Sequence, residues 1–174
     1  MTMNTTAHSV PGADTSGERP TSEPSVSEIL VGHGFRGWIA GYQTGDVGCW
    51  ERVWRLYSNT MSPASARVVV GCLAAFAKSV NCCSRRKVEV GAAGQCGFCR
   101  DEVLAVSMVA ASQHNTCPAM RACAFALVET ALLDDVLHHA DTFAITLRSQ
   151  QYVISPRWIV NANAYVDPSP MLPH

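Results

Sequence analysis

The chain has 174 residues, 48% hydrophobic and 16% charged, and this size and composition predict one folded domain. Its formal net charge of -1 excludes a protein that coats nucleic acid or an anionic membrane by charge alone. The sequence has no run of 18 apolar residues and no signal-like N-terminus. We therefore expect no transmembrane helix and an intracellular location, in the cytoplasm or the nucleus.

Both ends of the chain are expected to lie outside the folded domain. Residues 1–25 are rich in Thr, Ser, Pro and Gly and hold almost no large apolar side chains. Such a segment cannot bury enough surface to offset its loss of conformational entropy, so we expect a disordered tail. A helical cysteine-rich domain is expected over residues 26–166, and an irregular proline-rich tail over residues 167–174.

The first half of the domain predicts three helices. Apolar residues recur at helical spacing over residues 35–42 and again over residues 50–57. Ser62-Pro63 then supplies a cap and a first-turn proline for a helix over about residues 63–80. A glycine at every fourth position of the first helix predicts that another helix approaches it closely: Gly37, Gly41 and Gly45.

The second half begins with an irregular stretch, residues 81–98, that includes a four-residue strand candidate, KVEV. Helical patterns return over residues 100–112 and over one long segment, about residues 118–140. Beyond that, β-branched and aromatic residues predict short strands at 143–147, 152–154 and 158–160. The expected fold is mainly α: a single small domain of about five helices with a short β element near the C-terminus.

Cysteine is the strongest chemical signal in the sequence. The chain has eight cysteines, and without a secretory signal a reducing cytosol would keep them as thiols. Clustered thiols in such a protein indicate metal binding or thiol chemistry. The eight are Cys49, Cys72, Cys82, Cys83, Cys96, Cys99, Cys117 and Cys123.

The spacing of the cysteines favours zinc as the cofactor. Cys96 and Cys99 form a CxxC pair, and His114 with Cys117 extends it to C-x2-C-x14-H-x2-C. Zinc binds four such ligands in a tetrahedron, commonly as two close pairs. The expected helix between the pairs would be about 20 Å long at 1.5 Å per residue, which separates them unless it bends. Cys83 or Cys123 is then expected to replace a ligand of the second pair.

A thiol-disulfide oxidoreductase is the alternative. The sequence Cys96-Gly97-Phe98-Cys99 at a helix start resembles the active motif of the thioredoxin superfamily. The resemblance implies a nucleophilic Cys96, activated by the helix dipole, with Cys99 as the resolving thiol. The strand–helix–strand pattern that opens that fold is absent from this sequence, so a thioredoxin fold is not predicted.

The function predicted from the sequence is therefore that of an intracellular zinc-binding regulatory or protein-interaction protein, with a protein as its partner. The chain shows no nucleophile, P-loop or metalloprotease motif, which favours a non-enzymatic role. Two Lys against eleven Arg indicate a GC-rich bacterial or viral genome, and a viral accessory protein fits this composition.

Overall fold

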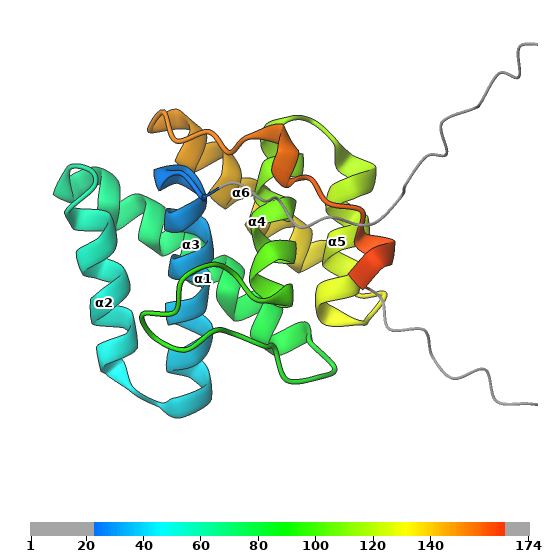
Figure 1. Cartoon of the computed structure of the whole chain (residues 1–174), viewed down its shortest axis with the longest axis horizontal. Helices are drawn as coiled ribbons and strands as arrows, with labels where there is room; N and C mark the ends of the chain where they lie inside the picture. Colours follow the sequence, from blue (N-terminus) through cyan, green and yellow to red (C-terminus); the bar gives the residue numbers. More distant parts are fainter. Residues whose placement is uncertain (1–22, 166–174) are drawn as a thin grey trace, which may run out of the picture.

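A computed structural model describes residues 23–165 of the chain. This part folds into six α-helices and two short 3-10 helices and contains no strand (Figure 1). The mainly helical fold class is confirmed. The proline-rich tail and nearly all of the N-terminal tail expected from the sequence lie outside the described residues. The helices are α1 Val26–Thr44, α2 Val47–Ser58, α3 Pro63–Cys83, α4 Arg100–Gln113, α5 Cys117–Val128, α6 Asp134–Ser149, η1 Pro156–Trp158 and η2 Ala162–Tyr165.

Local capping interactions set the helix boundaries. At the start of α1 the Ser25 backbone N–H donates to the Glu28 carboxylate at 2.7 Å, as in a capping box. Gly45 ends α1 in the left-handed conformation, with φ 72°. Ser62 caps α3 by accepting from the Ser65 backbone N–H at 3.2 Å, as its sequence predicts.

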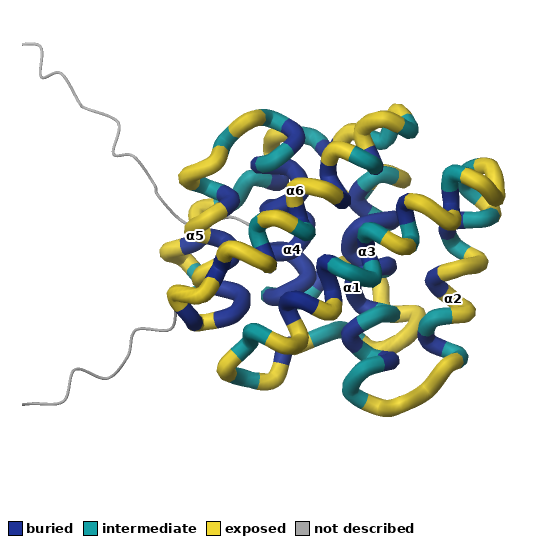
Figure 2. Tube along the Cα trace, turned by 180° about the vertical axis from the view of Figure 1, so that it is seen from behind, coloured by how far each residue is buried: buried dark blue, intermediate teal, exposed yellow. Residues whose placement is uncertain are grey.

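Helix α4 forms the centre of the domain. Every residue from Asp101 to Ala111 is buried, and α1, α5, α6 and η1 pack around the helix (Figure 2). A helix that is buried on all sides belongs to the core rather than to one surface. Its N-terminus, which follows Cys99, leads directly out to the loop that joins α3 to α4.

The prediction of close packing is confirmed at Gly37 and Gly41, where α2 approaches α1, but not at Gly45, which is the C-cap of α1 and has nothing within 4 Å of a Cβ position. A Cβ atom at Gly37 would lie 2.3 Å from Val53 Cγ2, and one at Gly41 would lie 2.2 Å from Trp50 Nε1. Both neighbours belong to α2. Small residues let the two helices approach until side chains of α2 touch the α1 backbone.

Two predictions about the C-terminal half are wrong. The long helix expected over residues 118–140 is two helices, because the chain turns at Glu129, whose φ is 54°, and resumes helical structure at Asp134. The strand expected at residues 143–147 is part of α6, where Phe143 and Leu147 are buried at helical spacing with the preceding Ala140. The described residues contain none of the expected β element.

Helix α3 is the one described helix that is long and apolar enough to span a membrane. The expectation from the sequence excluded such a helix, because Arg67 and Lys78 interrupt its apolar residues. In the fold α3 packs on α1, α2 and α6, and its most apolar window is 39% buried. The buried side includes Leu73, Phe76 and Val80. This buried side of α3 belongs to the domain core.

Candidate functional site

The loop of residues 84–99 is the longest segment between two α-helices and carries the CxxC pair. It leaves the C-terminus of α3 and crosses the domain beside α1 before it enters α4 (Figure 1). Residues 92–97 are all exposed, and Cys96 is among them. Cys99 is half-buried at the end of the loop, where it is the N-cap residue of α4.

A buried ion pair holds the second half of this loop. Arg36 of α1 donates from Nε to Glu102 Oε1 at 2.7 Å and from Nη2 to Glu102 Oε2 at 2.9 Å. The same guanidinium donates to the carbonyl oxygens of Gln95 at 2.8 Å and Gly97 at 2.6 Å. The Glu102 carboxylate accepts in turn from the backbone N–H of Gly91 at 2.8 Å and of Cys99 at 2.9 Å. One ion pair thus fixes the loop backbone on both sides of Cys96.

A second ion pair holds the first half of the loop. Arg86 donates to both Asp101 carboxylate oxygens, at 2.6 and 2.8 Å, and to Glu129 at 2.8 Å. Asp101 is fully buried and also accepts from the Glu89 backbone N–H at 2.7 Å. Gln43 of α1 donates to the Val88 carbonyl at 2.7 Å. Two backbone groups of the expected KVEV strand, the Val88 carbonyl and the Glu89 N–H, are therefore bonded to side chains, and the segment forms no strand.

Phe98 fixes the CxxC turn itself. Its side chain is buried and packs on the ring of His33 and on Trp158. A Cβ atom at Gly32 would lie 2.3 Å from the Phe98 ring, so the ring packs directly against the backbone of α1 at a position without a side chain. Gly97 takes a φ of 75°, which a residue with a side chain adopts at a cost. The turn thus points Phe98 into the domain.

Both thiols lie near the Arg36 guanidinium, but Cys96 is exposed and Cys99 is half-buried. The pKa of Arg36 is raised mainly by its hydrogen bond to Glu102, and the charges of Glu102, Cys99 and Cys96 add to this effect. Both thiols therefore lie within electrostatic range of the same guanidinium. The Cys99 Sγ donates to the Glu89 carbonyl at 3.1 Å, and burial raises the pKa of this thiol.

The structure does not bring His114 and Cys117 to the CxxC pair. They follow the C-terminus of α4, and 14 residues at 1.5 Å each separate that end from Cys99 by about 21 Å. His114 Nε2 instead lies 2.8 Å from the Ile154 carbonyl oxygen, and Cys117 is exposed at the start of α5. The straight helix thus keeps the two pairs apart.

The two substitute ligands are also placed elsewhere. Cys123 is buried in α5, with its Sγ 3.2 Å from Ser107 Oγ, and burial raises its pKa. Cys83 ends α3 and is half-buried, which likewise raises its pKa. Over residues 23–165, no three or more His, Cys, Asp or Glu side chains are grouped so that they could hold a metal ion.

The position of the helix start bears on the oxidoreductase alternative. Helix α4 begins at Arg100 with Cys99 as its N-cap, so Cys96 precedes the cap by three residues. The helix dipole acts within the first turn, where Cys99 lies. Burial raises the pKa of Cys99, which disfavours its thiolate, the form that attacks disulfides. The oxidoreductase alternative requires Cys96 at the N-terminus of the helix, and the structure places it three residues before the cap.

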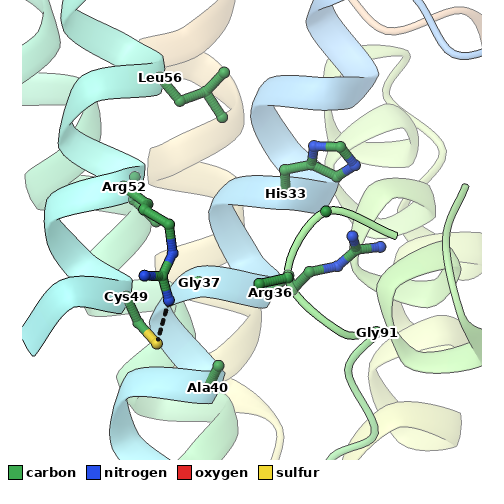
Figure 3. Close-up of a pocket in the computed structure, with 11 residues that line it drawn as sticks. His33, Arg36, Gly37, Ala40, Cys49, Arg52, Leu56 and Gly91 are labelled. Carbon is green, nitrogen blue, oxygen red and sulfur yellow. Dashed lines mark hydrogen bonds between the residues drawn. The ribbon is translucent and has the colours of Figure 1, made fainter. Parts of the chain in front are cut away.

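A pocket of about 270 Å³ lies between α1, α2 and the loop (Figure 3). Arg36 and Arg52 line it, but Arg36 is bonded to Glu102 and the loop, and Arg52 donates to Cys49 Sγ at 3.1 Å. Burial and the charge of Arg36 lower the pKa of His33, so its ring is neutral at pH 7. The remaining lining is mostly apolar. Arg36 is thus engaged within the protein, whereas the Arg52 side chain is half exposed and pairs with Asp46 at 3.7 Å. Because the CxxC pair lies on the loop, we place the candidate site there.

Sequence reasoning missed the residues that hold the loop. Asp101 and Glu102 have the position of acidic residues at a helix N-terminus, and Arg86 belongs to a short basic run. Neither pattern shows that the two carboxylates are buried or that they pair with arginines across the domain. No protein-family model, curated protein or solved structure matches the chain, so the candidate site rests on its own geometry.

Proposed function

We propose that the chain is a zinc-binding protein-interaction protein and that the loop of residues 84–99 is its binding site. Cys96 and Cys99 are the ligands that the chain supplies. The observation that carries this proposal is that two arginine–carboxylate pairs, Arg36–Glu102 and Arg86–Asp101, hold the loop that carries these two thiols, with both carboxylates buried.

The two ion pairs contribute more to fixing the conformation of the loop than to the stability of the domain. Taking charges out of water costs several kcal/mol per ion, and apolar residues of similar volume are often as stable. Here nearly every additional hydrogen bond of Arg36 and Glu102 goes to backbone groups of residues 91–99. Such an arrangement gives one fixed conformation to a segment without secondary structure. Pre-formed ligands avoid the entropy cost of ordering the loop when an ion binds.

The chemistry of the two ligands favours zinc. Thiolates are soft ligands, and paired cysteines are typical of structural zinc sites. Zinc binding displaces the thiol protons, and because burial raises the pKa of Cys99, zinc affinity should increase as the pH rises. Two thiolates leave two of the four zinc positions open. A partner protein that supplies ligands for these positions would be held through the ion, which connects zinc binding with protein interaction.

The experiment is a zinc titration of the full-length, reduced chain in competition with a chromophoric chelator. The Cys96→Ser and Cys99→Ser variants should each lose at least tenfold in zinc affinity. Serine is a preferred N-cap residue, so Cys99→Ser removes the ligand and keeps the cap of α4. Cys72→Ser and Cys117→Ser are the matched controls and should bind as the wild type does. Equal affinity in the wild type and in both loop variants would refute the proposal.

A further inference from the structure

We infer that the pocket between α1, α2 and the loop is a binding site for a short aliphatic carboxylate. The pocket has a volume of about 270 Å³, and one charged side chain, that of Arg52, lines it together with an apolar wall. Neither Cys96 nor Cys99 lines the pocket, so this site is separate from the two thiols and does not depend on zinc.

The wall of the pocket suits a hydrocarbon chain. Val53 and Leu56 of α2 and Ala40 of α1 line it, together with three small residues of the loop: Gly91, Ala93 and Gly94 (Figure 3). Burying hydrocarbon against such a wall is favourable. The volume lies near the lower end of the range for small-molecule sites, about 300–1,000 Å³. The pocket therefore fits a ligand of few atoms rather than a nucleotide.

Arg52 gives the pocket its charge. Of the three basic side chains that line it, Arg36 is bonded to Glu102, and His33 is neutral at pH 7 because burial lowers its pKa. The Arg52 guanidinium is half exposed and donates to Cys49 Sγ at 3.1 Å, although a thiol sulfur is a weak acceptor. An anion that enters the pocket thus meets one cation with donors available to it.

The ion pair that Arg52 already forms is weak. Its Nη2 lies 3.7 Å from Asp46 Oδ2, and both side chains are more than half exposed. Exposed pairs of this kind contribute little. A ligand carboxylate can form the two parallel hydrogen bonds that a guanidinium favours. Asp46 therefore competes with the ligand for Arg52, and its removal should strengthen binding.

The positions of the charge and the wall indicate the form of the ligand. Arg52 extends toward Cys49, and Leu56 lies at the opposite end of this stretch of α2 (Figure 3). Cys49 and Leu56 are about 10 Å apart along the helix at 1.5 Å per residue. Hexanoate with its head group at Arg52 has about this length. An amine would be repelled by the guanidinium, and a phosphate dianion needs more donors than an apolar pocket with one free cation supplies.

An NMR titration of the isotope-labelled, full-length reduced chain with hexanoate tests the inference, without added metal. Amide shifts should change in a saturable way at residues that line the pocket, such as Ala40, Val53 and Gly94. Hexanol and hexylamine, which lack the carboxylate, should bind about tenfold more weakly or not at all. Butyrate should also bind about tenfold more weakly, because it has two fewer methylene groups to bury.

Four variants separate the contributions of charge and space. Arg52→Gln should weaken hexanoate binding about tenfold, whereas Arg55→Gln, on the same helix but outside the pocket, should bind as the wild type does. Asp46→Asn keeps a preferred N-cap residue for α2 and removes the competing charge, so binding should tighten about twofold. Ala40→Leu fills the pocket and should abolish binding.

Three results would overturn the inference. Hexanol that binds as tightly as hexanoate would show that the pocket does not recognise the charge. Equal affinity of Arg52→Gln and Arg55→Gln would show that Arg52 does not hold the carboxylate. Shift changes that do not saturate, or that lie only outside the pocket, would show that hexanoate does not occupy it. The exposure of Arg52 makes a folding defect in Arg52→Gln unexpected, and thermal unfolding of each variant checks this.

Discussion

The Arg36 guanidinium and the Glu102 carboxylate form a buried two-point ion pair, with Nε–Oε1 at 2.7 Å and Nη2–Oε2 at 2.9 Å. Arg36 lies in α1 and Glu102 in the first turn of α4, so the pair joins two helices that are 66 positions apart in sequence. Because both side chains also bind the loop backbone, the packing of α1 on α4 and the shape of the CxxC loop depend on the same interaction.

The first prediction is that Glu102→Gln lowers the free energy of unfolding by about 3–5 kcal/mol, because it leaves the Arg36 charge buried without its partner. Urea denaturation measures the change. Glu51→Gln is the control, since it removes an exposed pair with Arg55 at 3.9 Å and should cost about 0.5 kcal/mol or less. Similar losses in the two variants would show that the Arg36–Glu102 pair contributes little.

The second prediction concerns the loss of stability at acidic pH. Burial alone raises the pKa of Glu102, but hydrogen bonds from Arg36 and from the backbone N–H of Cys99 and Gly91 outweigh burial and hold the pKa below its ordinary value of 4.5. The unfolded chain therefore takes up this proton first. The stability from Glu102 is complete above pH 4.5 and is lost as the pH falls through the lower pKa of the folded state. Between pH 4.5 and lower pH, urea denaturation should show a smaller decrease in the free energy of unfolding for Glu102→Gln than for the wild type. Equal decreases in the two proteins would show that Glu102 is not the group that titrates.

The third prediction concerns His33. Burial, helped by the charge of Arg36, lowers its pKa from 6.5. The folded protein holds the ring neutral, so the unfolded state binds the proton more readily. The stability from His33 is complete above pH 6.5 and decreases as the pH falls through the folded pKa. His33→Gln should flatten the change of unfolding free energy below pH 6.5; an unchanged pH profile would place the imidazole in solvent.

The fourth prediction compares two helical glycines. Gly32→Ala should destabilise the domain, since the new Cβ would meet the Phe98 ring and push the anchor of the CxxC turn outward. Gly71→Ala has open space around its Cβ and should stabilise α3 by about 0.5–1 kcal/mol through helix propensity. Thermal unfolding of both variants measures the changes. Stabilisation by both would show that Phe98 can move without cost.

Much of the fold could be predicted from local sequence signals. Ser62-Pro63 marks the start of α3, and the spacing of Gly37 and Gly41 predicts the close contact with α2. The end of α5 could not be predicted in the same way. Its turn passes through Glu129 in a left-handed conformation that the residue type disfavours, and the Arg86–Glu129 ion pair that accompanies it joins distant parts of the chain.

The candidate site could be predicted only in part. The CxxC spacing identified the thiols and placed them at a helix start, which the structure bears out for Cys99. The spacing of His114 and Cys117 also fits a zinc motif, but the intervening residues form a straight buried helix that separates the pairs. The sequence spacing of a motif does not show that its two halves are close in space, because a rigid helix between them can hold them apart. The two arginines that shape the loop act across the fold, so no local pattern could indicate them.

X-ray absorption at the zinc edge tests most directly whether Cys96 and Cys99 bind the ion. The zinc-loaded wild type should show sulfur ligands at about 2.3 Å, and the variant with both Cys96→Ser and Cys99→Ser should lose this signal. Cys117→Ser should give the wild-type spectrum. A wild-type spectrum with only nitrogen and oxygen ligands, or an unchanged sulfur signal in the double variant, would contradict the account.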